Sequence, residues 1–122
     1  MTIATSETTT SQPRPFPIAR LDLEEEIRQL RASPRPGDHL AKTLLHNADL
    51  RMVLMILDGE ARIPSHQARG SLTLHVLEGR VVASVREASF DLGPGEVLAI
   101  ARDEAHGLVA IEDSALLLTI AH

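Results

Sequence analysis

The stretch DGEARIPSHQARGSLTLHVLEGR, residues 58–80, decides the fold of this 122-residue chain. Side chains of a β-strand alternate between its two faces, so residues 66, 68, 70, 72, 74 and 76 share one face if no bulge intervenes. That face reads His, Ala, Gly, Leu, Leu, Val. We therefore expect these residues to form part of an interior that is mostly apolar.

Short apolar runs of four to seven residues surround this stretch from about residue 40 onward, separated by Gly, Pro, Asn and Asp. Such runs are typical of strands and not of helices. The candidates are 40–45, 51–57, 61–63, 72–77, 80–85, 89–92, 97–100, 108–111 and 115–120. We expect seven or eight strands from them, and their regular spacing favours a sandwich or a barrel.

Two of the runs, MVLMIL at 52–57 and ALLLTI at 115–120, are almost entirely apolar instead of alternating. This pattern predicts strands that are covered on both faces. A second subunit could supply the outer cover, and a patch of this size is large for a monomer. We therefore predict a twofold homodimer.

The N-terminal region divides into a tail and a helix. Residues 1–19 are rich in Thr, Ser and Pro, and we expect a disordered tail. Within residues 20–37, Leu23, Ile27 and Leu30 follow helical spacing, so we expect an amphipathic helix and linker, with the helix packed outside the barrel. The sequence SPRPG at 33–37 ends the helix. Residues 38–122 then form the barrel domain.

Composition excludes several classes of protein. The chain has no Cys, two Phe and neither Trp nor Tyr, and its net charge is −5. Disulfides, thiolate chemistry and Cys-held metals are excluded, and no aromatic platform or basic patch favours nucleic acid or an anionic membrane. No Gly-rich phosphate loop, His-Glu-x-x-His or Gly-x-Ser-x-Gly sequence occurs. Without a signal-like apolar segment near the N-terminus, we expect a cytoplasmic protein.

Two segments together resemble the cupin family. The family's first motif combines a His-x-His pair, a Glu and a closing Gly, and residues 58–80 resemble it, with His66 and Gly79 at the first histidine and closing glycine. Residues 94–110, PGEVLAIARDEAHGLVA, resemble the second motif, with Gly95 and His106 in place. The resemblance implies an all-β fold: a cupin-type antiparallel β-barrel, or jelly roll, with a short N-terminal helix.

The chain also departs from the family pattern. Ala68 stands where the second histidine is expected and Leu72 where the glutamate is expected, so two of the four usual metal ligands are missing. In the second motif Ala101, Asp103 and Ala110 replace the proline, the second glycine and the asparagine. The remaining metal candidates are His66 and His106, for a divalent ion such as Zn, Fe, Mn or Ni.

Two imidazoles alone make a weak metal site, since catalytic sites normally use at least three protein ligands. His75 is nearest in sequence, but its odd offset from His66 places it on the opposite strand face. Glu60, Glu104 and His46 are further candidates for a third ligand. For His75, His39, His46 and His122 the simpler interpretation is a position on the surface or at a dimer face.

Three hypotheses follow for function, and no catalytic residue is assigned. The first is a protein that binds a small molecule, with His66 and His106 contacting it directly or through a weakly held divalent metal. The alternative is a metal-dependent enzyme of the dioxygenase or isomerase type, which requires an unrecognised third ligand. The third is a metal-free dimer whose two histidines serve only packing.

Overall fold

The structure is a computed structural model that describes residues 18–122, which contain one helix and nine strands. The elements are α1 (Leu23–Ala32), β1 (His39–His46), β2 (Leu50–Leu57), β3 (Arg62–His66), β4 (Ser71–Glu78), β5 (Val81–Val85), β6 (Ala88–Leu92), β7 (Val97–Ile100), β8 (His106–Ala110) and β9 (Ser114–Ala121). All nine candidate runs form strands, so the number exceeds the seven or eight expected. The predicted tail over residues 1–19, apart from its last two residues, lies outside the described residues.

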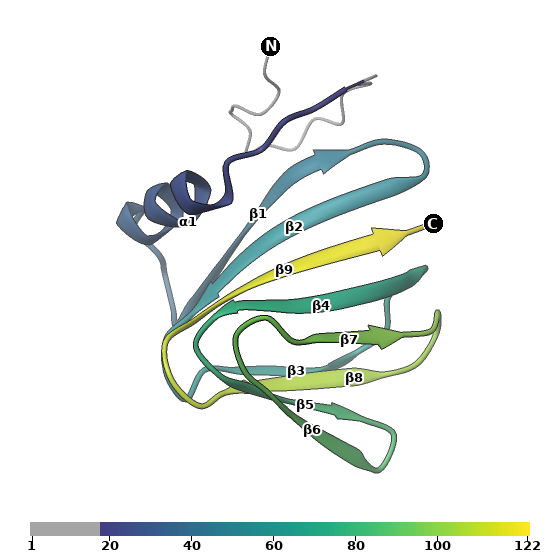
Figure 1. The fold of residues 1–122 in the computed structure, drawn as a ribbon. Coiled ribbons are helices and arrows are strands. Elements are labelled where there is room, and N and C mark those ends of the chain that lie inside the picture. Colours follow the sequence, from purple (N-terminus) through teal and green to yellow (C-terminus); the bar gives the residue numbers. More distant parts are fainter. Residues whose placement is uncertain (1–17) are drawn as a thin grey trace.

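Two antiparallel sheets face each other in Figure 1 and enclose the interior. Sheet A has the strand order β1-β2-β9-β4-β7, and sheet B has the order β3-β8-β5-β6. Each sheet therefore combines strands that are distant in sequence, as in β2 beside β9 and β3 beside β8. The prediction of an all-β antiparallel barrel with a short N-terminal helix is confirmed.

Aliphatic side chains fill the space between the sheets. On β4, Leu72, Leu74 and Val76 are buried while the residues between them are more exposed, as expected for a strand with one inner face. They belong to a cluster with Leu57, Ala61, Val81, Ala83, Leu92, Ile100, Leu108, Ala110 and Leu116. The expectation of a mostly apolar interior is confirmed.

The chain changes sheets between His66 and Leu72. β3 ends at His66 in sheet B, and β4 begins at Ser71 in sheet A, so residues 67–70 form a crossing loop. The side-chain amide of Gln67 donates a hydrogen bond of 2.8 Å to the carbonyl oxygen of Asp103, which fixes this loop. The prediction that residues 66, 68, 70, 72, 74 and 76 share one face of a single strand is therefore wrong, because the chain changes sheets within this segment.

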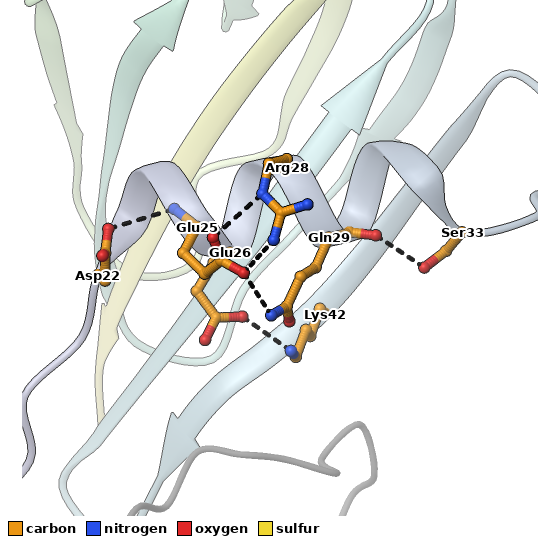
Figure 2. Close-up of polar contacts among 7 residues, drawn as sticks. All are labelled: Asp22, Glu25, Glu26, Arg28, Gln29, Ser33 and Lys42. Carbon is orange, nitrogen blue, oxygen red and sulfur yellow. Dashed lines mark hydrogen bonds and ion pairs between the residues drawn. The ribbon is translucent and has the colours of Figure 1, made fainter.

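Helix α1 has a defined beginning and end (Figure 2). The Asp22 carboxylate accepts a hydrogen bond of 3.2 Å from the backbone amide of Glu25, which caps the first turn. The Glu25 side chain also pairs with Arg28. Lys42 on β1 contacts Glu26 at 2.8 Å, and both side chains are largely buried, so this ion pair fastens the helix to the sheet.

Helix α1 covers the apolar outer face of sheet A (Figure 1). Ile27 and Leu30 pack with Leu54 and Ile56 of β2 and with Leu117 of β9. These two strands are the fully apolar runs whose outer cover we expected from a second subunit. Because the helix supplies that cover from within the chain, their apolar pattern alone does not require a partner.

The barrel has two ends, which we name the mouth and the base. The mouth consists of loops 47–49, 67–70, 86–87 and 101–105 together with His122; the base consists of loops 58–61, 79–80, 93–96 and 111–113. Strand register places these loops together, because the β1–β2 turn, the start of β4 and the end of β9 are paired neighbours. The end of β3 and the start of β8 are paired on sheet B at the mouth.

Candidate functional site

His66 and His106 are direct neighbours at the mouth. His66 is the last residue of β3, His106 is the first of β8, and the two are cross-strand partners. Their ring centroids lie 4.5 Å apart at an interplanar angle of 58°. Partners in an antiparallel pair project from the same face, so two residues forty positions apart in sequence form one pair.

Backbone carbonyls fix the orientation of both rings. Nδ1 of His66 lies 3.0 Å from the carbonyl oxygen of Pro64, and Nδ1 of His106 lies 3.0 Å from that of Glu104. A carbonyl oxygen only accepts, so each Nδ1 carries a proton and donates it. In this tautomer each ring would present the lone pair of its Nε2. Carbonyl partners of this kind orient histidines that bind metal ions through Nε2.

The two rings differ in exposure. His106 is only 5% exposed, and its Nε2 is buried without a hydrogen-bond partner. His66 is exposed, so it lies at the mouth and not in the interior, to which the strand alternation assigns it. An unpaired buried polar atom costs about 1–3 kcal/mol. A ligand at the mouth would remove that cost at His106.

The four candidates for a third ligand lie elsewhere or are engaged. Glu60 belongs to the base, and His75 projects from the outer face of β4, between buried neighbours that face inward. His46 lies beside His122, with ring centroids 5.9 Å apart. The Glu104 carboxylate accepts hydrogen bonds of 2.8 and 2.6 Å from Arg86, which lower the pKa of Glu104.

The comparison with known families decides the classification. The Cupin domain family matches residues 52–121, more than half of the chain. The chain belongs to the cupin family. No curated protein matches it.

Several solved structures share the architecture. A conserved protein of unknown function from Streptococcus pyogenes is 22% identical with a TM-score of 0.71, over 92% of this chain and 95% of that one. A cupin superfamily protein from Desulfitobacterium hafniense is 16% identical with a TM-score of 0.70, over 95% and 98%. KdgF from Halomonas is 25% identical with a TM-score of 0.65, over 73% and 82%. The first two establish the fold.

The donor set of this cupin fits a metal ion only in part. Two Nε2 atoms with oriented rings suit a divalent transition metal. However, no group of three His, Asp or Glu side chains that could hold a metal occurs within residues 18–122. Ala68 and Leu72 carry no donor, and Ala68 packs against the interior cluster that contains Leu72. Two protein ligands would hold such an ion weakly, leaving its other positions to water or a ligand.

Sequence reasoning missed a second polar group at the mouth. Arg51 and His46 are cross-strand partners, and His122 follows β9 at the same end. The simpler interpretation of the sequence places both histidines on the surface or at a dimer face, with His46 also a candidate third metal ligand, and it does not single out Arg51. The signal lay in their positions, because each of the three stands at the terminus of an apolar run, where strand ends meet.

Proposed function

We propose that this cupin binds a small molecule at the mouth of its barrel domain, residues 38–122. The Nε2 atoms of His66 and His106 would contact it, either directly or through a weakly held divalent ion such as Zn, Fe, Mn or Ni. The observation that carries the proposal is the buried Nε2 of His106, which has no partner and adjoins an exposed imidazole. A pair that served only packing would have no reason to keep this atom unpaired.

Binding is a better account than metal-dependent catalysis of the dioxygenase or isomerase type. Such an enzyme needs a metal held by at least three protein groups with positions open for substrate. His66 and His106 supply two, and the nearest carboxylate in sequence, Glu104, is engaged by Arg86. The two histidines are instead consistent with a weakly held ion whose remaining coordination positions are filled by the bound molecule.

The direct experiment is calorimetric titration of the untagged protein with ZnCl₂. We expect one weak site per chain, and His106→Ala should reduce its affinity by about 100-fold or more, since ligand loss exceeds the effect of losing an orienting partner. His75→Ala is the matched control, because His75 projects from the outer face of β4. Its affinity should stay within about twofold of wild type. Equal binding by the His106→Ala variant would overturn the proposal.

We also propose a twofold homodimer. Phe90, Val97 and Ile111 remain exposed outside both apolar clusters, and Val97 lies on β7 at the edge of sheet A. Exposed aliphatic groups beside a sheet edge favour association. Light scattering at micromolar concentration should give twice the chain mass of 13.3 kDa. A value equal to one chain would contradict the dimer.

A cytoplasmic location is likewise a proposal. The chain has no Cys, which is compatible with a reducing compartment. No helix among residues 18–122 is long and apolar enough to cross a membrane. Fractionation of cells that produce the full chain should recover it with the cytoplasmic fraction, and recovery with any other fraction would contradict the proposal.

A further inference from the structure

We propose that Arg51, His46 and His122 form a second binding site at the mouth, which accepts the carboxylate of a small organic acid. The inference rests on the proposed function, because it names the class of molecule that would also reach His66 and His106. The two groups lie on opposite sheets of the same end, Arg51 on sheet A and the histidine pair on sheet B. One ligand could therefore contact both.

Strand register brings the three side chains together. His46 and Arg51 are cross-strand partners on either side of the β1–β2 turn. Arg51 also pairs with Ile120 of β9, and His122 lies two residues further along the chain (Figure 1 shows the end of β9). The rings of His46 and His122 are 5.9 Å apart. Three nitrogen-bearing side chains thus gather at one corner of sheet A.

Arg51 projects toward the interior side of the sheet. Counting by two along β2 from Arg51 leads to Met55 and Leu57, both part of the interior cluster. Its strand partner Ile120 packs against the same cluster. Arg51 therefore belongs to the inner face of sheet A at the mouth, where a ligand bound at that end of the barrel would meet it.

The guanidinium has an unmet hydrogen-bonding requirement. Its Nε is buried and has no hydrogen-bond partner, and none of the ion pairs within residues 18–122 includes Arg51. By contrast, Arg86 and Arg80 are both paired with carboxylates. A planar guanidinium binds a carboxylate through two parallel hydrogen bonds. Carboxylate binding would satisfy the buried Nε.

The charge of the site favours a single negative charge. Burial lowers the pKa of His46, and the nearby Arg51 and His122 lower it further. His46 is therefore neutral at neutral pH, and a neutral imidazole still donates one N–H. Arg51 is the one fixed positive charge of the three, which suits a carboxylate better than a dianionic phosphate.

Local contacts hold the backbone of this site in place. The Asn47 side chain accepts hydrogen bonds of 2.9 and 2.8 Å from the amides of Asp49 and Leu50, which fixes the β1–β2 turn. The amide of His122 donates a 3.0 Å hydrogen bond to the carbonyl of Asp49. A Cβ at Gly70 would lie 1.9 Å from the Ala121 carbonyl oxygen, so only glycine permits this approach to the end of β9.

The body of the acid is expected to be apolar. Ile120, Ile63 and Val85 are partly buried and pack against the interior cluster from both sheets. Val85 is the cross-strand partner of His106, and Ile120 is that of Arg51. An aliphatic chain that extends from Arg51 toward the histidine pair would therefore contact hydrocarbon.

The test uses sodium hexanoate and its neutral analogue hexanamide as probes, titrated into the full chain at constant ionic strength. NMR signals of the imidazoles report binding at each pair. We expect hexanoate to shift His46 and His122 and to bind at least about tenfold more tightly than hexanamide, as for a hydrogen bond between charged groups. Equal affinity for the two probes would overturn the inference.

Substitutions distinguish specific binding by Arg51 from nonspecific attraction to positive charge at the mouth. Arg51→Gln should weaken hexanoate binding about tenfold or more. Arg51→Lys keeps the positive charge but lacks the planar pair of N–H donors, so its affinity for hexanoate should lie between those of the wild type and Arg51→Gln. Arg102→Gln removes the same charge from loop 101–105 at the mouth and should change affinity less than about twofold. Arg51→Gln and Arg102→Gln with equal affinities would overturn the inference.

The two proposals fail separately. Hexanoate binding that shifts His66 and His106 but does not depend on Arg51 would overturn this inference alone. Binding that depends on Arg51 yet is unchanged in His66→Ala and His106→Ala would contradict the proposed function alone. Arg51-dependent binding that is weakened by both histidine substitutions supports both.

Discussion

The base and the mouth of the barrel differ in whether their buried polar side chains have hydrogen-bond partners. At the base, the buried hydroxyl of Ser114 donates to the carbonyl of Glu112 at 2.7 Å and accepts from the amide of Arg80 at 3.1 Å. The amide of Gly59 is likewise bound by the Asp113 carboxylate at 2.8 Å. At the mouth, the unpartnered buried side-chain atoms are Arg51 Nε and His106 Nε2. The buried polar side chains of the base are satisfied, whereas two buried nitrogens at the mouth have no partner among the described residues.

The two ends also differ in charge. The base loops carry five acids and one arginine, whereas the mouth loops carry four acids and three arginines. Four of the six histidines also lie at the mouth, namely His46, His66, His106 and His122. The base loops therefore carry a net charge of −4 and the mouth loops a net charge of −1, so an anion is repelled less at the mouth, where we propose the site.

Glycine substitutions at the base should produce the largest effect. Gly79 has φ +88°, and a Cβ there would lie 2.3 Å from the Asp113 carbonyl oxygen, so Gly79→Ala combines backbone strain with a clash. We expect a loss of about 3 kcal/mol or more in the free energy of unfolding. Gly95→Ala is the matched control, with φ +85° and no atom within 4 Å. It should cost only about 1 kcal/mol. Equal losses in urea denaturation would contradict this account of the base.

Substitutions of a paired and of an unpaired buried polar side chain should change the free energy of unfolding by an intermediate amount. Ser114→Ala removes a satisfied hydroxyl and leaves its partners unpaired, so it should cost about 1–3 kcal/mol. His106→Leu loses the Nδ1 hydrogen bond to the Glu104 carbonyl but also replaces the unpartnered buried Nε2 with hydrocarbon. The two effects oppose each other, so its stability should stay within about 1 kcal/mol of wild type while Zn²⁺ binding is lost. Urea denaturation and calorimetry measure the two quantities. A loss for His106→Leu as large as that for Ser114→Ala would break the comparison.

The smallest effect concerns pH at the mouth. Burial and the adjacent Arg51 and His122 lower the pKa of His46 in the folded state, so the unfolded chain binds that proton first. Wild-type stability should therefore decline slightly, relative to His46→Gln, as the pH falls below the usual value of 6.5. Thermal melts of both proteins from pH 8 to pH 5.5 measure this. A relative stability of the wild type that stays constant with pH, or that increases as the pH falls, would contradict it.

Much of the fold could be predicted from periodicity and turn residues. All nine apolar runs form strands, and the helical spacing of Leu23, Ile27 and Leu30 predicts a helix that does pack outside the barrel. The change of sheet at residues 67–70 could not be predicted, because the alternating pattern is the same before and after a crossing. The sequence also could not predict that α1 packs on the outer face of β2 and β9, because an apolar face does not specify which element covers it.

The candidate site was predicted in part. The spacing of the two family motifs identifies His66 and His106, and their rings are adjacent. The position of the two rings at the mouth of the barrel was not predictable, because it depends on β3 ending at His66. Arg51 was missed because an arginine at the start of an apolar strand is most simply a solvated strand end. Only the pairing of β2 with β1 and β9 places it beside two histidines.

The most direct test of the account is the nitrogen NMR spectrum of the protein labelled with ¹⁵N histidine, recorded before and after addition of ZnCl₂. We predict that Nδ1 is protonated and Nε2 is unprotonated in both His66 and His106, and that Zn²⁺ shifts both Nε2 signals together while His75 is unchanged. A proton on Nε2 of either ring, or Zn²⁺ shifts that spare this pair, would contradict the claim that the mouth is a binding site built on these two histidines.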